Sequence, residues 1–409
     1  MLNTIKNNFL NKINSIYPNS KLNHTNEEKR ETTVRRYKNT DENSYNKNNE
    51  KTPLFKKRLF KYDNMKGLAI IGVVLTHVIN RFKVPLYRNI ADLAAPVCMP
   101  LFFFVSGYFS KTDKNAPINA VRNILVPFFL FCTTWYIFQF VLFGKIPSLS
   151  KFPYLTPATT LWFLLSLFYL RLLLPVLIRI KYIFWISLLA ALIIGLYPLP
   201  VNLLSVSRTL LYVPIFLLGY YFRNSDEYLQ TLKPKLRQTA IKLSDFLKTN
   251  KKIIFVVLIV ILVGLYFAYL GIPGGFVGGK FPYSHFDIGR KMGMLMRLFC
   301  ISTSIIVVIL INYITPNKKS FLTKLGRNSL SIYVLHFYFI EILENLFFKK
   351  TEMGISLRSD PIFGGIFIIV FSAILLFILS RDFIENNIRK LVKAIGNIMI
   401  SDKINDKMR

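Results

Sequence analysis

The sequence predicts an all-α polytopic membrane protein, and three observations lead to this fold class. Of the 409 residues, 53% are hydrophobic, and the mean hydropathy is +0.40. The apolar residues form long blocks rather than alternating stripes, which is typical of transmembrane helices. The formal net charge is +32, and the cations cluster between these blocks, as they do in the cytoplasmic loops of membrane proteins. Because of this distribution we expect no nucleic-acid partner, although nucleic-acid binding is the usual alternative for so basic a chain.

The first segment, residues 1–60, is rich in Lys and Asn and poor in aromatic residues. A segment of this composition cannot bury enough apolar surface to form a core, so we expect a disordered basic cytoplasmic tail. Apolar residues recur at helical spacing within residues 1–17, which is typical of a helix lying on a membrane surface. The segment has no continuous apolar region of the kind found in a signal peptide.

Ten apolar segments follow, each long enough to cross a bilayer at about 20 residues. We therefore expect one transmembrane domain over residues 61–381 with about ten helices, followed by a basic cytoplasmic tail at 382–409. The expected spans are 64–82, 93–110, 121–143, 160–179, 182–199, 206–222, 253–271, 292–314, 329–348 and 362–380.

Lys and Arg predict the orientation of these spans. The connections 223–252 and 315–328 are rich in cations, and so is the segment after residue 380. The connections on the opposite side carry fewer cations, and the longest of them, 271–289, is rich in Gly and aromatic residues. Both termini are therefore expected in the cytoplasm.

The first span contains Lys66, ten further residues and then His77. Eleven helical steps end only about 20° past three full turns, so the two side chains share one face about 16 Å apart. Asp63 lies close to the same face. The ninth span also rises from a cation, Arg327, and carries His336 at a similar depth, about 13 Å in. Two histidines at one depth in the membrane predict a functional site, because an ionisable group there is costly.

These residue types predict the chemistry of proton transfer beside an anionic cofactor. A histidine exchanges protons near neutral pH, so His77 and His336 are candidates for catalysis on a hydroxyl. Lys66 and Arg122 suit the phosphates of a cofactor. Further candidate residues on the cofactor side are Asp63, Ser106 and Gly107, and candidates for contact with a second substrate are Trp162, His285, Glu341 and Glu344.

Several of these residues also have a purely structural explanation. A histidine in a membrane helix can serve as an interhelical hydrogen-bonding group. Lys66 can be a snorkelling anchor, and Arg122 can be a positive-inside residue. Trp162 can belong to an interfacial aromatic belt, and His285 can be a solvated loop residue. The three cysteines lie inside apolar runs without the spacing of a metal site, so we expect no metal.

At these residues the sequence resembles the acyltransferase family 3 membrane proteins, and in particular a subgroup similar to fucose 4-O-acetylase. Such proteins have a basic residue, ten residues and a histidine in the first span, here Lys66 to His77, with Lys in place of the more common Arg. The resemblance extends over residues 62–380. The other similar stretches are MPLFFFVSGYFSK at 99–111, Arg122 to Phe128, LWFLLSLF at 161–168 and LGRNSLSIYVLH at 325–336.

The resemblance implies transfer of an acyl group, usually acetyl, from cytoplasmic acetyl-CoA or another acyl-CoA to a sugar hydroxyl at the plasma membrane. His77 would be the catalytic residue, and Lys66 and Arg122 would bind the donor. The expected partners are the lipid bilayer, a glycan or lipid-linked sugar acceptor, and proteins of polysaccharide assembly. A membrane carrier or exporter of such a glycan is the alternative function, and a scaffolding protein of such an assembly is a third.

Overall fold

The computed structural model describes residues 59–145, 154–157, 160–198, 203–231, 234–273 and 275–400. The expected tail at 1–60 therefore lies almost wholly outside the described residues. Within these ranges the chain forms helices and no strands. The α-helices are α3 (Phe60–Ile79), α4 (Pro85–Phe109), α5 (Ala116–Ala120), α6 (Val126–Phe143), α7 (Trp162–Leu177), α8 (Ile183–Ile193), α9 (Val206–Arg223), α10 (Ser225–Thr231), α11 (Pro234–Thr249), α12 (Lys251–Tyr269), α13 (Arg290–Ile314), α14 (Phe321–Arg327), α15 (Ser329–Ile342), α16 (Glu352–Leu357), α17 (Phe363–Leu379) and α18 (Asp382–Met399). The shorter 3₁₀ and π elements are η1 (Val121–Leu125), η3 (Ile194–Leu196), η4 (Leu203–Ser205), η5 (Tyr283–Phe286) and η6 (Leu343–Phe348).

Each of the ten expected spans coincides with a helix, but fewer than ten of these helices qualify as membrane spans. Six of the described helical segments are long and apolar enough to cross a bilayer, and α17 with α18, bent by 58°, would make a seventh. The first helix, α3, falls short because Lys61, Asp63 and Lys66 lie in its first two turns. Helices α7 and α8 are short, with 16 and 11 residues. The described helices thus support a polytopic membrane protein with six candidate spans, or seven if the bent pair is one span.

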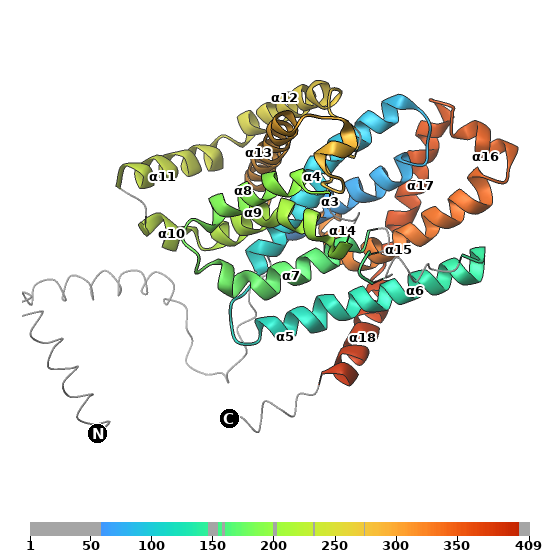
Figure 1. The fold of residues 1–409 in the computed structure, drawn as a ribbon, viewed down its shortest axis with the longest axis horizontal. Coiled ribbons are helices and arrows are strands. Elements are labelled where there is room, and N and C mark those ends of the chain that lie inside the picture. Colours follow the sequence, from blue (N-terminus) through green and yellow to red (C-terminus); the bar gives the residue numbers. More distant parts are fainter. Residues whose placement is uncertain are drawn as a thin grey trace, which may run out of the picture. The chain divides into compact units, whose positions relative to one another are not determined.

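Helix α3 lies in the middle of the helical bundle, where α4, α14, α15 and α17 pack around it (Figure 1). Its side chains Met65, Ile70, Val74 and Val78 are fully buried. Burial on all sides is the expected environment of a helix that is apolar around most of its circumference. This central place puts both Lys66 and His77 inside the molecule rather than on a lipid-facing surface.

The first turn of α3 is fixed to the segment that leads into α14 by Asn64. Its Nδ2 donates to the carbonyl oxygens of Pro316 and Lys318 at 3.0 and 2.9 Å. Its Oδ1 accepts from the hydroxyls of Ser320 and Thr323 at 2.9 and 2.6 Å. All four hydrogen bonds of one buried amide are thus used to position the cationic end of α3. We call this end of the bundle, which holds Lys61 and Lys66, the basic end.

Helices α4 and α9 approach one another closely through two glycines. A Cβ atom at Gly107 would overlap the carbonyl oxygen of Phe216, and a Cβ atom at Gly219 would overlap that of Phe104. Close backbone contact of this kind is typical of small residues between membrane helices. Gly107, a candidate residue on the cofactor side, therefore makes its close contact with α9.

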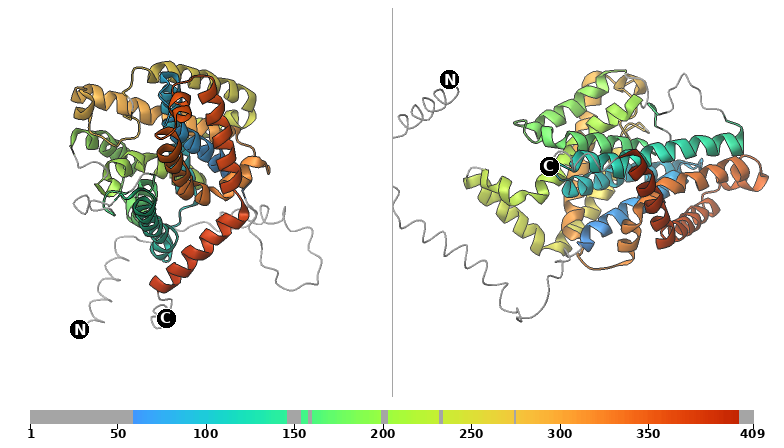
Figure 2. Two further views of the ribbon diagram at one scale, coloured as in Figure 1. Left: turned by 90° about the vertical axis from the view of Figure 1, so that its right-hand side faces the viewer. Right: turned by 90° about the horizontal axis from the view of Figure 1, so that it is seen from below.

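The expected tail at 382–409 begins with an amphipathic helix, α18, which projects from the bundle (Figure 2). Its buried Glu385 accepts a hydrogen bond from the Ser331 backbone N–H at 2.8 Å. At its first residue, hydrogen bonds from Asn328 and Arg327 hold the pKa of the Asp382 carboxyl below its ordinary value. Exposed Phe383 and Ile398 lie on its outer side, as in a helix that rests on a membrane surface. Residues 401–409 lie outside the described ranges.

Candidate active site

The two membrane histidines lie side by side. The ring centroids of His77 on α3 and His336 on α15 are 5.3 Å apart, and the ring planes meet at 38°. His336 is fully buried, and its Nδ1 lies 2.9 Å from the carbonyl oxygen of Ile332. This contact assigns the His336 proton to Nδ1, since a carbonyl can only accept. Nε2 then carries a lone pair, and it has no hydrogen-bond partner among the described residues.

Aromatic rings enclose the histidine pair on the side away from the basic end. Phe337 meets the His77 ring edge-on at 5.4 Å, and Trp135 of α6 packs on Phe337 at 5.4 Å. The guanidinium of Arg81 also lies over the Phe337 ring, 5.2 Å from its centroid. His77 itself is part-buried. The two histidines thus lie in an apolar, aromatic environment. Water competes weakly there for hydrogen bonds to the imidazole nitrogens.

A cavity of about 340 Å³ opens between the basic end and the histidine pair. This volume falls near the lower end of the range of small-molecule sites, about 300–1,000 Å³. Its polar lining comes from five different helical segments, α3, α4, η1, α7 and α15, and its remaining walls are apolar. The polar and charged lining residues are Lys66, Ser106, Asn123, Arg171, Ser329 and Tyr333.

Two cations face this cavity, and each is held by a neighbour. Lys66 Nζ pairs with Asp63 Oδ1 at 2.9 Å, one turn earlier on α3. Arg171 Nη2 donates to the hydroxyl of Ser106 at 3.2 Å, which joins α7 to α4. The Nε of Arg171 is buried without a hydrogen-bond partner among the described residues. A cavity with two positioned cations and apolar walls suits a ligand with an anionic group and an apolar arm.

Tyr333 connects this cavity to the histidine pair. It lines the cavity, and its ring centroid lies 6.3 Å from that of His336, one turn further along α15. Its hydroxyl donates to the carbonyl oxygen of Thr160, which fixes the ring against the segment before α7. The Tyr333 ring therefore lies between the cavity and the two imidazoles, neither of which lines the cavity itself.

Trp162 is buried in the bundle, with 9% of its surface exposed. The guanidinium of Arg208 lies 4.4 Å from its ring centroid, and Tyr212 stacks on it at 5.8 Å. Arg208 is also within electrostatic range of His77 and Tyr333. The Arg208 guanidinium and the rings of Trp162 and Tyr212 lie together near the starts of α7 and α9, beside the histidine pair. We call this group the aromatic wall.

Glu341 and Glu344 lie beyond His336 and are both ion-paired. Glu341 contacts Arg81 Nη2 at 3.6 Å and Lys145 Nζ at 3.3 Å. Glu344 contacts Arg358 Nη1 at 3.3 Å. These pairs link the end of α15 and η6 to the segments that follow α3, α6 and α16.

The remaining predicted residues lie outside the cavity lining. Arg122 sits on the π-helical turn η1, where its side chain packs against Gly396 of α18, while its neighbour Asn123 lines the cavity. His285 is exposed on η5 and stacks on Phe281 with centroids 4.1 Å apart. The ring contacts of His285 all fall within its own loop.

Sequence reasoning missed three residues of this site: Arg171, Arg208 and Tyr333. Arg208 falls near the start of the expected span 206–222, lies on α9 and faces the interior. The sequence does carry a signal for both arginines, because each is the single cation of an apolar run. Arg171 lies in WFLLSLFYLRLLLPVL, and Arg208 lies in VSRTLLYV. An arginine in a membrane segment almost always faces the bundle interior. Tyr333 carried no comparable signal, because buried tyrosines are frequent in such helices.

A family model described as an acyltransferase domain, that of acyltransferase family 3, matches residues 59–381. No curated protein and no solved structure matches the chain. The matched range begins at the first described residue and ends between α17 and α18. It contains the cavity, the histidine pair and the aromatic wall. The chain therefore belongs to acyltransferase family 3.

Proposed function

We propose that this acyltransferase moves an acyl group, most simply acetyl, from cytoplasmic acyl-CoA to a sugar hydroxyl of a cell-surface or exported glycan, at the plasma membrane. The observation that carries this proposal is the arrangement along α3 and α15. A cavity with Lys66 and Arg171 lies toward the basic end, and His77 with His336 lies deeper. The excess of cations supports a cytoplasmic position for the basic end.

In this proposal the donor enters from the basic end. Its phosphates pair with Lys66 and Arg171, because guanidinium and ammonium groups bind phosphate oxygens strongly. Its apolar arm follows the cavity wall of Phe102, Phe163 and Leu167 toward Tyr333. The thioester then reaches the neighbourhood of His77.

His77 acts as general base toward the acceptor hydroxyl. It takes the hydroxyl proton while the hydroxyl oxygen attacks the thioester carbonyl. The C–S bond then breaks, and the CoA thiolate recovers the proton from the imidazolium. A variant of this path places the acyl group briefly on His77 before the hydroxyl attacks. In either path His336 offers its Nε2 lone pair to orient the His77 ring.

The acceptor approaches on the side of Trp162 and Arg208. Aromatic faces pack well against the apolar faces of sugar rings, and the guanidinium offers hydrogen bonds to sugar oxygens. Glu341, Glu344 and the loop that carries His285 remain candidates for contact with the distal part of a glycan.

The test is incorporation of label from [14C]acetyl-CoA into extracted glycan by membranes that contain the chain. We expect His77→Ala to abolish the labelling while the protein remains expressed. His24→Ala is the matched control, because that histidine has no assigned role and we expect it to leave the labelling unchanged. Full labelling by His77→Ala would contradict the mechanism. Absence of donor-dependent labelling in the wild type would favour a carrier of the glycan instead.

A further inference from the structure

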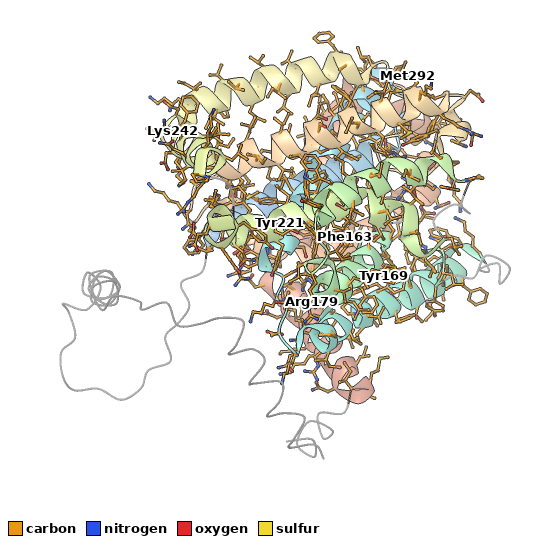
Figure 3. The ribbon with its side chains drawn as sticks, turned by 60° about the vertical axis from the view of Figure 1, so that its left-hand side comes forward. Phe163, Tyr169, Arg179, Tyr221, Lys242 and Met292 are labelled. Atoms are coloured by element: carbon orange, nitrogen blue, oxygen red, sulfur yellow. The ribbon has the colours of Figure 1, made fainter. Side chains whose placement is uncertain are left out.

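A second and larger cleft, of about 810 Å³, opens at the basic end of the bundle. It lies among α10, α11, α12 and α13, and the first turn of α3 closes one side. Figure 3 shows Lys242 of α11 at one end of the α12–α13 pair and Met292 at the other, and the cleft belongs to the Lys242 end. It shares none of its lining residues with the cavity beside Lys66.

The cleft is lined by four cations and two carboxylates. The cations are Lys61, Arg237, Lys248 and Lys251, and the carboxylates are Asp226 and Asp245. Only one ion pair joins the two groups within the described residues, between Lys248 Nζ and Asp245 Oδ1 at 3.3 Å.

Three of the four cations, Lys61, Arg237 and Lys251, have no carboxylate within ion-pair distance among the described residues. Lys61 and Lys251 also repel one another electrostatically. The backbone N–H of Lys61 donates to Asn317 Oδ1 at 3.1 Å, so the first turn of α3 is held beside the cleft. An anion bound between the two ammonium groups would remove their repulsion.

A buried amide in the cleft has unused hydrogen-bonding capacity. Asn312 of α13 is fully buried, and it lines the cleft. Neither its Nδ2 nor its Oδ1 has a hydrogen-bond partner among the described residues. Buried polar groups in native proteins are almost always paired, so this amide offers a free donor and a free acceptor to a molecule in the cleft. A ligand that pairs with both functions accepts from Nδ2 and donates to Oδ1.

We propose that this cleft binds a phosphate ester that also carries a free hydroxyl, at a site separate from the donor cavity. The phosphate lies between Lys61, Lys251 and Arg237, and its oxygens accept the Asn312 amide hydrogens. The hydroxyl donates to Asn312 Oδ1. Two sources supply this chemistry at the membrane surface: the headgroup of an anionic phospholipid such as phosphatidylglycerol, and a soluble ester such as glycerol 3-phosphate. The proposal does not depend on the acyl-transfer mechanism.

The test measures binding to the purified chain in a neutral detergent by native mass spectrometry. The probes are phosphatidylglycerol, glycerol 3-phosphate and phosphatidylcholine, whose headgroup has no net charge and no hydroxyl. We expect saturable binding of phosphatidylglycerol or of glycerol 3-phosphate, and the probe that binds identifies the source. Phosphatidylcholine is expected to bind at least tenfold more weakly.

The variants test whether binding depends on the residues of this cleft or only on the net positive charge of the chain. Arg237→Met and Asn312→Leu should each weaken binding at least tenfold, while Lys242→Met on the exposed part of α11 should leave it unchanged. Asn312→Leu also removes an unpaired buried amide, so its unliganded form should unfold at a higher temperature than the wild type. Arg237 is exposed, so its substitution keeps the fold. Equal affinity of wild type and both variants for each probe, or no saturable binding of either hydroxyl-bearing probe, would overturn the proposal.

Discussion

The imidazole of His77 on α3 lies 5.3 Å, centroid to centroid, from that of His336 on α15. Because Nδ1 of His336 is engaged by the Ile332 carbonyl, the nitrogen left over is Nε2, with its lone pair. A buried acceptor beside a second imidazole can fix both the tautomer and the ring orientation of its neighbour. This relationship makes His77 the candidate base and His336 its positioning residue.

If His336 positions His77, its loss should lower kcat more than it changes KM. We expect His336→Phe to reduce kcat by roughly 10- to 100-fold, the usual effect of losing a group that orients a functional histidine. The KM for acetyl-CoA should stay near that of the wild type, since His336 does not line the donor cavity. His336→Gln, which keeps a side-chain acceptor, should recover part of the lost rate. Steady-state kinetics measures both constants. A 10- to 100-fold rise in KM with unchanged kcat would instead assign His336 to substrate binding.

Arg171 should act on donor affinity. Its guanidinium faces the cavity beside Lys66, and a hydrogen bond to a charged group is worth about 1.5–3 kcal/mol. We therefore expect Arg171→Met to raise the KM for acetyl-CoA by roughly tenfold or more. Arg179→Met is the matched control, because Arg179 is exposed just beyond the end of the same helix, α7. An unchanged KM in Arg171→Met would remove this arginine from the donor site.

The glycines on α4 and α12 predict opposite effects of the same substitution. Gly107→Ala should destabilise the protein strongly, because the added methyl overlaps the Phe216 carbonyl in a rigid helix contact. Gly264→Ala on α12 meets nothing within 4 Å, and it should stabilise the helix by up to about 1 kcal/mol. Thermal unfolding in detergent compares the two. A Gly107→Ala protein as stable as the Gly264→Ala protein would show that α4 and α9 are not in close contact.

Asn64 should be a structural residue rather than a catalytic one. Asn64→Ala leaves two carbonyl oxygens and two hydroxyls without their partner, and a buried unsatisfied group costs about 1–3 kcal/mol. We expect a clearly lower unfolding temperature, whereas Asn119→Ala, at an exposed position, should have almost no effect. The pH profile of the residual activity should not shift. A shifted profile at unchanged stability would contradict the structural role.

The sequence predicted the helical segments well because each of them is a continuous apolar block. It predicted the number of membrane spans less well, because α3 is central and charged at its start, while α7 and α8 are short. A helix surrounded by other helices does not need the hydropathy of one that faces lipid. Residue counting from the expected cytoplasmic boundary was sufficient to place His77 and His336 at one depth, and the structure brings their rings together.

The parts of the site that depend on helix rotation could not be predicted. Arg208 and Arg171 are each a single charge in an apolar run of the sequence. The rotation of α9 places Arg208 over Trp162, and the rotation of α7 places Arg171 beside Ser106. Gly107 was expected near a ligand because glycine permits close approach, but a single sequence does not reveal which partner approaches. The amphipathic helix α18 was not predicted, because the composition of residues 382–409 indicated only a basic tail.

In the proposed function, donor binding and catalysis use different groups along α3, Lys66 and His77. The most direct measurement is equilibrium binding of acetyl-CoA to purified protein in detergent, comparing the wild type with Lys66→Ala and His77→Ala. We expect Lys66→Ala to weaken binding by roughly tenfold or more, as the loss of a charged phosphate contact should. We expect His77→Ala to bind as the wild type does but to transfer no acetyl group. Undiminished binding by Lys66→Ala, or no binding by well-folded wild type, would contradict this division of roles.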